Sequence, residues 1–473
     1  MNAVDDVDVV VLGLGPGGEE LAETLARRGR SVVGVDPRLV GGECPYYGCI
    51  PSKMMLRGAE VLQEGRRVAA LAGSASVLPD FGPVHARIRD EATDDWDDRV
   101  AVERLEGTGA TFVRAAGRLD GRDDDGRLLV QAGERSFHAA HVVVATGTAP
   151  ALPPIEGLAE LRASGSGWTG PVWTNRDTMH AETAPPSLIV LGGGPIGCEL
   201  GQAFARFGSK VTVVANGPQL LPREEPEAGE VLADVFRREG IDVRLNASTA
   251  RVSAGGDGVE LSLADGGTVT GTKLLVAAGR TPNLHDIGLS SIGLDDKARS
   301  LTVDEHMRVL LDDDPVDRLY AIGDIAGHGA FTHLSIWQAR VLVAHLMGEH
   351  EPFGGYDGLA WTTFTDPEVG HVGKTEREAR DAGLSVRTGT AQISSNTRGW
   401  IHGPGNEGFV KVVADGDAGV LVGATAIGPN GGEILAVLTL AVHAKVPVST
   451  LLSMHYVYPT LHRAVLEALR ELD

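Results

Sequence analysis

The start of the chain contains a strand, a glycine-rich turn and a helix in direct succession, and this succession restricts the possible folds most. Residues 7–12, V-D-V-V-V-L, form a short β-branched run typical of a buried strand. The turn G-L-G-P-G-G over 13–18 follows at once, and the next ten residues have a helical pattern. A second strand over 31–35 leads to Asp36. This order predicts a dinucleotide-binding unit.

Each glycine of this turn has its own role in such a unit. Gly13 allows the tight turn, Gly15 lets the backbone approach a pyrophosphate, and Gly18 allows close packing of the helix on the strand. Asp36 can accept a hydrogen bond from a ribose hydroxyl. A purely structural glycine-rich turn is the alternative, but the strand, the helix and the terminal acid together favour the binding unit.

The same succession occurs a second time. A strand, the turn G-G-G-P-I-G, a helix and a further strand occupy 187–214. Gly192, Gly194 and Gly197 correspond to the three glycines of the first turn. Two such units predict two bound dinucleotides and an α/β fold with two Rossmann-like domains.

Two cysteines lie close together in the stretch 41–53, which reads G-G-E-C-P-Y-Y-G-C-I-P-S-K. Four residues separate Cys44 from Cys49, and the chain has one further cysteine, Cys198, which we interpret as a packing residue. A disulfide between the first two would close a very small ring, which is a weak structural link but a readily reduced one. Unrelated buried cysteines and a metal site are the alternatives, and no further ligand lies nearby at a suitable spacing. We therefore predict a redox pair, on a helix that begins near Cys44 and whose dipole stabilises a thiolate.

The stretch 41–53 resembles the active-site signature of the flavin-dependent pyridine nucleotide–disulfide oxidoreductases, and the resemblance covers nearly the whole chain. This family includes dihydrolipoamide dehydrogenase, glutathione reductase and mercuric reductase. The resemblance implies FAD on the first unit and NADPH or NADH on the second. It implies that Cys49 lies against the flavin, that Cys44 meets the substrate, and that Lys53 pairs with Glu199 beside the flavin. Electrons would then pass from the nicotinamide through the flavin to a Cys44–Cys49 disulfide.

Three further segments carry the resemblance. They are H-V-V-V-A-T-G-T-A-P over 141–150, L-L-V-A-A-G-R-T-P-N over 274–283 and L-Y-A-I-G-D-I-A-G over 319–327. In the family pattern the aspartate of the last segment binds the ribityl chain of the flavin. The resemblance adds these residues to the predicted cofactor site: Gly42, Thr146, Gly147, Gly279, Arg280 and Asp324.

The resemblance also implies the domain organisation. An FAD-binding domain would take 1–150 and 274–348, an NAD(P)-binding domain 151–273, and an α+β interface domain 349–473. In relatives the interface domain forms a two-fold homodimer and lends residues to the partner's active site. We therefore expect an α/β protein with two Rossmann-like domains and a C-terminal dimerisation domain.

The family pattern breaks near the C-terminus. Relatives that act on small disulfides carry His-Pro-Thr there, with a glutamate that orients the histidine. Here Tyr458 precedes Pro459 and Thr460, and Arg463 stands in place of the glutamate. A tyrosine phenol titrates at about pH 10 in water and is a poor base at neutral pH. His455 or His462 is a candidate replacement, with an ordinary helix-end or interface histidine as the alternative, and Tyr458 could instead donate a hydrogen bond to a bound oxyanion.

The nicotinamide preference and the acceptor depend on weaker signals. The second unit's last strand is followed by Ala215 and Asn216, which favour neither ribose form, whereas Arg223 could reach a 2′-phosphate. The stretch 210–226 resembles mercuric reductases, which favour NADPH, and we predict NADPH on that basis. Mercuric reductases also carry a C-terminal cysteine pair, but this chain ends V-L-E-A-L-R-E-L-D, so we do not expect that activity.

Composition restricts the partners and the compartment. A net charge of −22 argues against nucleic acid and anionic membranes, and no run of 18 apolar residues is present. Three cysteines and an acidic start without a signal pattern indicate a cytoplasmic enzyme. We expect a disulfide, a quinone or a metal ion as acceptor. The alternatives are a quinone reductase or transhydrogenase-like enzyme with idle cysteines, and a flavoprotein component of a larger complex.

Overall fold

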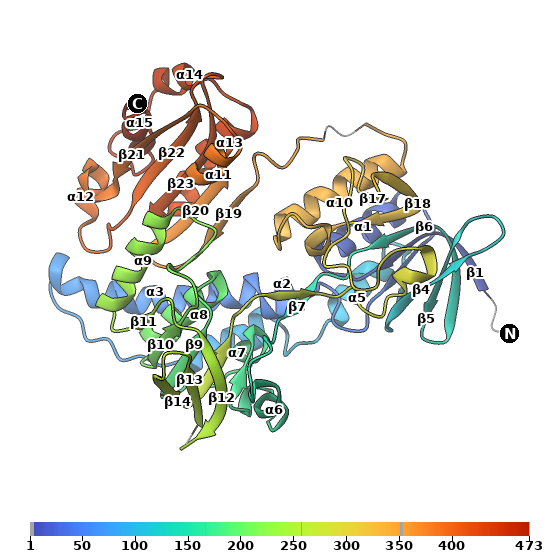
Figure 1. Ribbon diagram of the computed structural model, residues 1–473, viewed down its shortest axis with the longest axis horizontal. Helices are drawn as coiled ribbons and strands as arrows, with labels where there is room; N and C mark the ends of the chain where they lie inside the picture. Colours follow the sequence, from blue (N-terminus) through green and yellow to red (C-terminus); the bar gives the residue numbers. More distant parts are fainter. Residues whose placement is uncertain (1–3, 166, 257, 351–352, 473) are drawn as a thin grey trace. The chain divides into compact units, whose positions relative to one another are not determined.

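The computed structural model describes residues 4–165, 167–256, 258–350 and 353–472 (Figure 1). These residues fall into two compact units. The first unit takes the described residues within 1–51, 88–150 and 280–355. The second unit takes those within 52–87, 151–279 and 356–473.

The first unit is built on a mainly parallel sheet. Its strands follow the order β17-β18-β6-β1-β2-β3, in which β17 alone runs antiparallel to its neighbour. The hairpin of β4 and β5 extends the sheet from β6. The bounds of these strands are β1 Val4–Leu12, β2 Val32–Val35, β3 Thr111–Val113, β4 Gly117–Arg122, β5 Leu128–Ala132, β6 Arg135–Val144, β17 Arg308–Leu311 and β18 Asp314–Ala321.

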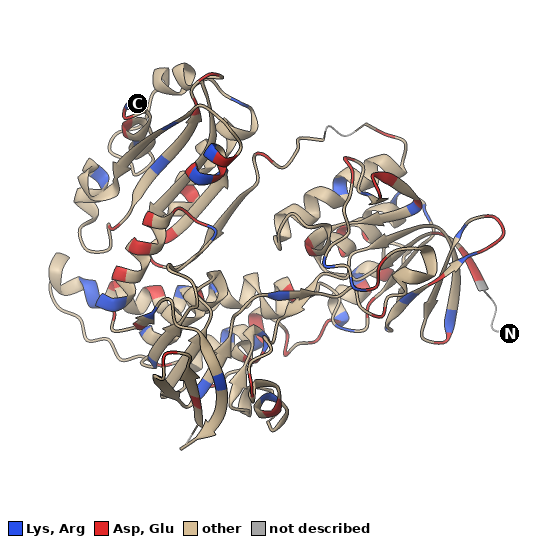
Figure 2. Cartoon of the chain, viewed as in Figure 1, with Lys and Arg blue, Asp and Glu red and all other residues tan. Residues whose placement is uncertain are grey.

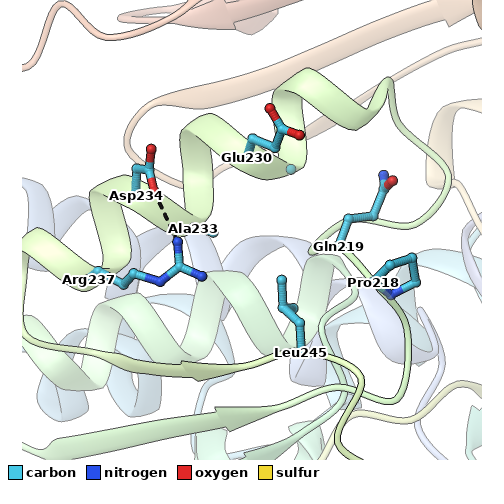
Figure 3. Close-up of a pocket in the computed structure, with 8 residues that line it drawn as sticks. Pro218, Gln219, Glu230, Ala233, Asp234, Arg237 and Leu245 are labelled. Carbon is cyan, nitrogen blue, oxygen red and sulfur yellow. Dashed lines mark hydrogen bonds and ion pairs between the residues drawn. The ribbon is translucent and has the colours of Figure 1, made fainter.

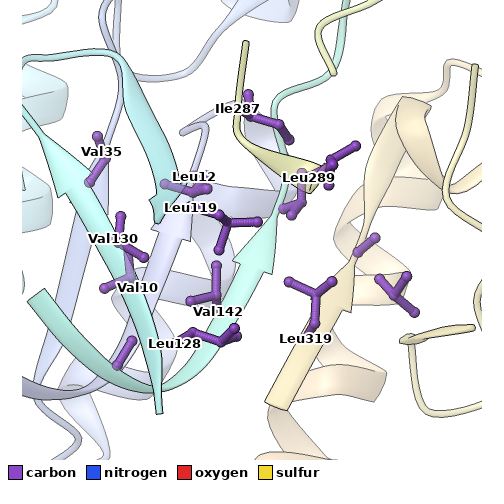
Figure 4. Packing of buried hydrophobic residues seen from close by; sticks show 14 of the residues in the cluster. Val10, Leu12, Val35, Leu119, Leu128, Val130, Val142, Ile287, Leu289 and Leu319 are labelled. Atoms are coloured by element: carbon purple, nitrogen blue, oxygen red, sulfur yellow. The ribbon is translucent and has the colours of Figure 1, made fainter. Parts of the chain in front are cut away.

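Both faces of β1 are buried, which is why its sequence is almost continuously apolar. Val10 and Leu12 pack with side chains of β4, β5 and β6 on one face (Figure 4). Val9 and Val11 pack on the other face, against α1 (Pro16–Arg27) and α10 (Thr332–Leu346). Burying a valine or leucine side chain contributes about 1.5–3 kcal/mol. These alternating residues therefore stabilise the packing of the sheet against the elements on both of its faces.

The cysteine stretch forms two helices. α2 covers Glu43–Tyr47 and α3 covers Cys49–Leu71, with Gly48 between them at φ −125° and ψ −119°. We predicted a helix beginning near Cys44, and the structure begins one helix there and a second one at Cys49. The non-helical backbone of Gly48 interrupts the run and makes Cys49 the first residue of α3.

Two segments of the first part of the chain divide into short elements. Within 141–150, β6 ends at Val144, and β7 (Thr148–Pro150) forms a separate pair with β16 (Arg280–Pro282). The region over 80–102 contains three short elements. They are α4 Gly82–Arg87, a π-helical turn Ile88–Ala92 and α5 Arg99–Glu106.

The second unit contains a wholly parallel sheet in the order β11-β10-β9-β15-β8. A three-stranded antiparallel sheet of β12, β13 and β14 lies on its core. Its strands are β8 Val172–Trp173, β9 Ser187–Leu191, β10 Lys210–Val214, β11 Asp242–Arg244, β12 Thr249–Gly255, β13 Gly258–Leu263, β14 Thr268–Gly271 and β15 Lys273–Val276. Its helices are α6 Leu158–Ala163, α7 Asn175–Met179, α8 Pro195–Arg206 and α9 Pro226–Arg238.

The C-terminal part of the second unit is an antiparallel sheet with helices, as predicted. The strand order is β19-β20-β23-β22-β21, and α13 and α15 pack on the sheet. The strands are β19 Ala360–Thr363, β20 Glu368–Gly373, β21 Val386–Gln392, β22 Phe409–Asp415 and β23 Val420–Gly428. The helices are α11 Glu376–Asp381, α12 Thr397–His402, α13 Gly431–His443, α14 Val448–Ser453 and α15 Arg463–Arg470.

The observed elements confirm the predicted α/β class. Each parallel sheet has a strand–glycine turn–helix–strand unit at its centre, and an α+β part follows. Within the part of the chain that the structure describes, no helix is both long and apolar enough to cross a membrane.

Candidate functional site

Four predicted residues of the first unit follow four neighbouring parallel strands. Asp324 follows β18, Thr146 follows β6, Gly13 follows β1 and Asp36 follows β2. Ligands of open parallel sheets bind outside the carboxyl ends of the strands, because the following loops meet there. The structure therefore brings these residues together along one edge of one sheet.

The first glycine turn has the geometry that the sequence predicted. Gly13 has φ +98°, and a Cβ there would lie 2.4 Å from the Ala145 carbonyl oxygen. A Cβ on Gly18 would lie 2.1 Å from the Gly13 carbonyl oxygen. A Cβ on Gly15 would meet nothing within 4 Å, so the absent side chain leaves open space at the start of α1. A pyrophosphate fits such a space, because the amide groups at a helix N-terminus attract an anion.

Asp36 is oriented by two backbone amides. Leu14 N donates to Oδ2 and Arg38 N donates to Oδ1, each over 2.8 Å. Each carboxylate oxygen can accept more than one hydrogen bond. The buried carboxylate is therefore held in place with capacity for a ribose hydroxyl.

The loop after β6 presents a buried hydroxyl group that fits a ligand. Thr146 Oγ1 has no hydrogen-bond partner among the described residues. The next residue, Gly147, has φ +62°, a conformation that favours glycine. A buried polar atom without a partner costs about 1–3 kcal/mol, so a bound group that reaches it would be stabilised. This observation supports the fit of FAD to the edge of the first sheet.

Asp324 lies at the end of a short hydrogen-bonded chain with Thr148 at its centre. Thr148 Oγ1 donates to Asp324 Oδ2 over 2.5 Å, and Arg280 Nε donates to the same hydroxyl oxygen over 2.5 Å. Burial raises the pKa of Asp324 above its ordinary value. Arg280 Nη2 also lies 3.6 Å from Glu43 Oε2, the residue before Cys44. Arg280 thus connects the predicted flavin aspartate with the cysteine helices.

The remaining predicted glycines lie at turns. Gly42 has φ +68° and caps α2, and a Cβ there would lie 2.8 Å from Gly15 Cα. This close approach brings the cysteine stretch against the first glycine turn. Gly279, in the second unit, has φ +120°, and its carbonyl accepts from Ala151 N over 3.0 Å.

Cys44 and Cys49 lie side by side as thiols. Their hydrogen bond raises the pKa of Cys44, and partial burial raises it further, so Cys44 keeps its proton and shares it with Cys49 Sγ. Cys49 is exposed at the first turn of the 23-residue helix α3, where the helix dipole favours a negative charge. The Cys49 sulfur also lies 3.5 Å from Thr332 Oγ1, at the start of α10. Sequence reasoning missed Thr332, because no local pattern indicates this contact.

The second glycine turn repeats the geometry of the first. Gly192 has φ +119°, and a Cβ there would lie 2.3 Å from the Ala277 carbonyl oxygen. A Cβ on Gly197 would lie 2.3 Å from the Gly192 carbonyl oxygen, whereas one on Gly194 would meet nothing within 4 Å. The open space again faces the N-terminus of a helix, α8, and fits the pyrophosphate of NADPH or NADH.

Lys53 and Glu199 form the ion pair that the resemblance implied. Lys53 Nζ lies 2.8 Å from Glu199 Oε2. Lys53 is on α3, one turn beyond Cys49, and Glu199 is on α8, two residues past the last glycine of the turn. The glutamate side chain is nearly buried, so the lysine neutralises a charge that has lost most of its water.

Arg223 packs against an aromatic ring. Its guanidinium lies 5.1 Å from the centroid of the Trp361 ring on β19. The next residue, Glu224, is buried and accepts from Trp361 Nε1 over 2.6 Å at Oε1. The loop before α9 is therefore attached to the C-terminal sheet through one tryptophan.

Glu224 and His371 form a buried pair. Burial raises the pKa of Glu224 to about 7 and lowers the pKa of His371 to about 4. His371 Nε2 lies 3.1 Å from the Gly373 carbonyl, which assigns the ring proton to Nε2 and leaves Nδ1 as an acceptor. Thr425 Oγ1 lies 2.9 Å from that Nδ1 and donates to it, and Glu224 Oε2 lies 3.5 Å from the same nitrogen.

The residues that depart from the family pattern lie at the surface of the C-terminal part. Tyr458 is 63% exposed, its hydroxyl lies 3.4 Å from Thr397 Oγ1, and the Arg463 guanidinium lies 5.4 Å from its ring centroid. His455 is exposed, and the His462 ring lies 5.8 Å from that of Tyr456.

Large apolar side chains are exposed beside Tyr458. Trp400 on α12 is 73% exposed and Val457 is 66% exposed, and Thr397, at the start of the same α12, contacts Tyr458. Exposed apolar groups gathered in this way are typical of protein interfaces. Elsewhere acidic residues are spread over helices and loops, several of them along α9 (Figure 2).

A hollow of about 270 Å³ lies beside α9, near the ends of β10 and β11 (Figure 3). Asp234 Oδ1 lies 3.0 Å from Arg237 Nη1 at its edge. The lining residues are Pro218, Gln219, Gly229, Glu230, Ala233, Asp234, Arg237 and Leu245. None of the predicted site residues lines it, so it is separate from the cysteines and the glycine turns.

Comparison with known sequence families gives two matches. The family described as "Pyridine nucleotide-disulphide oxidoreductase" matches residues 7–340. Its "dimerisation domain" matches residues 359–469. Together the matches cover most of the chain.

Curated relatives and solved structures agree with these matches. A dihydrolipoyl dehydrogenase of Haloferax volcanii is 30% identical, over 98% of this chain and 95% of the relative. A mercuric reductase of Acidithiobacillus ferrooxidans is 31% identical, over 97% of this chain and 81% of the relative. LpdA of Mycobacterium tuberculosis has a similar structure, with a TM-score of 0.84 and 28% identity over 99% of both chains. The HOCl-induced flavoprotein disulfide reductase RclA of Escherichia coli has a TM-score of 0.79 and 25% identity, over 98% of this chain and 99% of RclA.

The Glu224–His371 pair predicts an unusual dependence of stability on pH. From pH 4.5 to about 7 the folded carboxyl keeps a proton that the unfolded carboxyl loses, so its contribution falls as pH rises. His371 acts oppositely, since its contribution is lost as pH falls from 6.5 to about 4. Between pH 4.5 and 6.5 both effects operate, and their opposite changes in the free energy of unfolding nearly cancel.

Replacing Glu224 by glutamine removes the contribution of this carboxyl group to the pH dependence of stability. Glutamine can still accept from Trp361 and does not titrate, so no buried group at this position loses a proton as pH rises. We expect Glu224→Gln to stabilise the protein by about 3 kcal/mol above pH 7 and by little at pH 4.5, measured as thermal unfolding midpoints across this range. Glu230→Gln on the exposed side of α9 is the control. An equal change in midpoint at pH 5 and pH 8 would contradict the assignment.

Proposed function

This chain belongs to the pyridine nucleotide–disulphide oxidoreductase family, and from that premise we propose that it passes electrons from NADPH to an acceptor through Cys44 and Cys49. Members of the family are flavoprotein oxidoreductases that bind FAD and NAD(P)H and act on sulfur groups. The observation that carries the proposal is the contact between the two thiols, whose hydrogen bond raises the pKa of Cys44. Two thiols in contact can form a disulfide when they give up two electrons and two protons.

The two cysteines have different roles in this proposal. We assign the negative charge to Cys49, because the Cys44 thiol is hydrogen-bonded to it and the N-terminus of α3 stabilises a negative charge. The Thr332 hydroxyl, 3.5 Å away, can donate a second hydrogen bond to the same sulfur. Cys44 is then the thiol that exchanges with the acceptor.

FAD, when bound, supplies the two-electron carrier between the nicotinamide and the dithiol. Residues along the edge of the first sheet would hold it, among them Gly15, Asp36, Thr146 and Asp324. Lys53, held by Glu199, would place a positive charge beside it. We also propose the domain limits 1–150 with 274–348 for FAD, 151–273 for the nicotinamide nucleotide and 349–473 for the interface, and a cytoplasmic location.

We propose NADPH as the electron donor. The residue after β10 is Ala215, which cannot bind a ribose 2′-hydroxyl as a carboxylate would. Arg223, which lies beside the Trp361 ring, is the residue that would bind a 2′-phosphate. A ratio of kcat/KM that favours NADPH over NADH supports this preference, and the reverse ratio contradicts it.

The acceptor is proposed from the residues that replace the family's histidine and glutamate. A general acid–base contributes about 10²–10⁴-fold, so a chain with Tyr458 and Arg463 in those positions should act poorly on lipoamide and glutathione disulfide. Reduction of an unusual disulfide, a quinone or a thiophilic metal ion depends less on an imidazole as general acid–base. Tyr458 would donate a hydrogen bond to the acceptor, and His455 is the second candidate for that role.

The redox state of the cysteines gives the first prediction from the dithiol mechanism. Anaerobic titration of the FAD-loaded protein with NADPH should produce a long-wavelength absorption band at two-electron reduction, because a thiolate then lies against the flavin. Cys49→Ser should abolish the band, whereas Cys44→Ser should give it without reductant. Direct bleaching of the flavin without such a band would mean that the dithiol is idle.

A quinone reductase with idle cysteines is the second candidate function, and the missing histidine–glutamate pair favours it. The double variant Cys44→Ser, Cys49→Ser separates the two functions. A quinone reductase keeps its turnover in this variant, whereas a dithiol enzyme loses activity on disulfides and thiophilic metals.

The second prediction concerns Thr332. Thr332→Val removes a donor from Cys49 Sγ while it keeps the shape of the side chain. A hydrogen bond to a charged group contributes about 1.5–3 kcal/mol, so the long-wavelength band should need a pH about one unit higher to form. Thr332→Ser retains the hydroxyl and is the matched control. A band that forms at the same pH in all three proteins would contradict this role.

The third prediction concerns the homodimer, which the dimerisation domain supports. Trp400→Asp places a charge among the exposed apolar groups of the C-terminal part. We expect the molar mass in solution to shift from dimer toward monomer, measured by light scattering after size exclusion. Leu78→Asp, which places a charge at an exposed apolar residue elsewhere in the chain, is the control. An unchanged dimer in Trp400→Asp would locate the interface elsewhere.

A further inference from the structure

Phe364 is an aromatic residue that is not buried in a hydrophobic core. It follows β19 directly and is 37% exposed, among the large apolar side chains left at the surface. Its ring centroid lies 4.5 Å from Lys53 Nζ. A lysine ammonium within about 6 Å of an aromatic face is attracted to the ring.

Glu199 connects the same two residues a second time. Its Oε2 accepts from Lys53 Nζ over 2.8 Å, and its Oε1 accepts from Phe364 N over 2.8 Å. The carboxylate, the ammonium and the ring therefore form a closed triangle. The lysine is attracted by both of the other two groups, and the carboxylate determines where the ring's backbone lies.

The segment that carries Phe364 is fastened to α8 by further contacts. Gln202 accepts from Asp366 N over 2.8 Å and donates to the Asp366 carbonyl over 2.7 Å. Arg206 Nη2 lies 2.8 Å from Asp366 Oδ2. Arg67 Nη2, on α3, lies 2.9 Å from the same oxygen. These contacts hold the backbone of the segment, so the ring position does not depend on its own burial.

A lysine side chain is otherwise flexible, and holding it costs conformational entropy of up to about 2 kcal/mol. An ion pair alone places the nitrogen near a carboxylate but leaves the stem several rotamers. The ring of Phe364 restricts the ammonium on a second side, and about a third of the Lys53 side chain still remains accessible. This accessible part is what a cofactor could contact.

We propose that Phe364 is a positioning residue that, together with Glu199, holds the Lys53 ammonium in one place for its contact with the cofactor. This inference depends on the proposed function, in which Lys53 places a positive charge beside the flavin. Phe364 acts through Lys53, so its effect is expected in the energetics of the bound cofactor rather than in substrate binding.

The test compares Phe364→Leu with Phe364→Tyr by measuring the two-electron potential of the bound flavin. Leucine stays apolar and keeps the backbone bond to Glu199 but removes the ring face, whereas tyrosine retains the ring. We expect Phe364→Leu to lower the equilibrium constant for flavin reduction about two- to tenfold, and Phe364→Tyr to restore it. A tenfold change corresponds to about 30 mV for a two-electron couple.

Phe112→Leu is the matched control. Its ring lies 4.7 Å from the Arg114 guanidinium, so this variant removes the same kind of pair at a position that does not involve Lys53. Its flavin potential should equal that of the parent protein.

A double-mutant cycle with Lys53→Met separates the inference from the proposed function. Lys53→Met alone should lower the potential more than Phe364→Leu, and Phe364→Leu should have no further effect in the Lys53→Met background. If Lys53→Met lowers the potential but Phe364→Leu does not, the inference is overturned and the role of Lys53 stands. If Lys53→Met leaves the potential unchanged, the proposed role of Lys53 is wrong, and the inference fails with it.

A series of fluorinated phenylalanines at position 364 keeps the test decisive if the leucine variant does not fold. Fluorine weakens the negative face of the ring with little change in shape. The potential should fall steadily with the number of fluorine atoms. A potential that does not depend on fluorination would exclude an electrostatic role for the ring.

Discussion

The structure depends on two places where backbone atoms approach so closely that no side chain fits. At Gly18 and Gly197 the first turn of a helix rests on the carbonyl oxygen of the glycine that begins the turn. A Cβ at either position would overlap that oxygen, so any other residue would push the helix away from its strand. Each helix N-terminus would then lose its position at the edge of its sheet. The nucleotide sites and the contacts made further along α8 all follow from this approach.

This constraint explains why so much of the fold could be predicted. The glycine spacing, the buried valine strands and the terminal Asp36 are local features, and β1, α1, β9, α8 and β10 appear where the sequence placed them. The cysteine pair and the ion pair of Lys53 with Glu199 were predicted from the family resemblance. Gly48 permits a distorted turn, but the division of the stretch into two helices at this glycine was not predicted.

Other parts of the candidate site arise from contacts between residues distant in the sequence. Thr332 reaches Cys49 across 283 positions, and Phe364 reaches Glu199 across 165. The Glu224–His371 pair likewise joins a loop before α9 to a strand of the C-terminal sheet. Such pairs carry no periodicity and no motif, so only the three-dimensional arrangement reveals them. The substitution of Tyr458 and Arg463 was visible in the sequence, but the acceptor that suits them was not.

The contacts of α8 also affect which changes the chain can tolerate during evolution. Glu199, Gln202 and Arg206 hold the segment around Phe364 from positions i, i+3 and i+7, which share one face of a helix. Replacing any one of them leaves the contacts of the other two in place. Inserting or deleting one residue after Glu199 would rotate the rest of the helix by about 100° and turn the other two side chains away together. Helix α8 can therefore vary in composition but not in length, and relatives that keep this attachment should show no gaps within it.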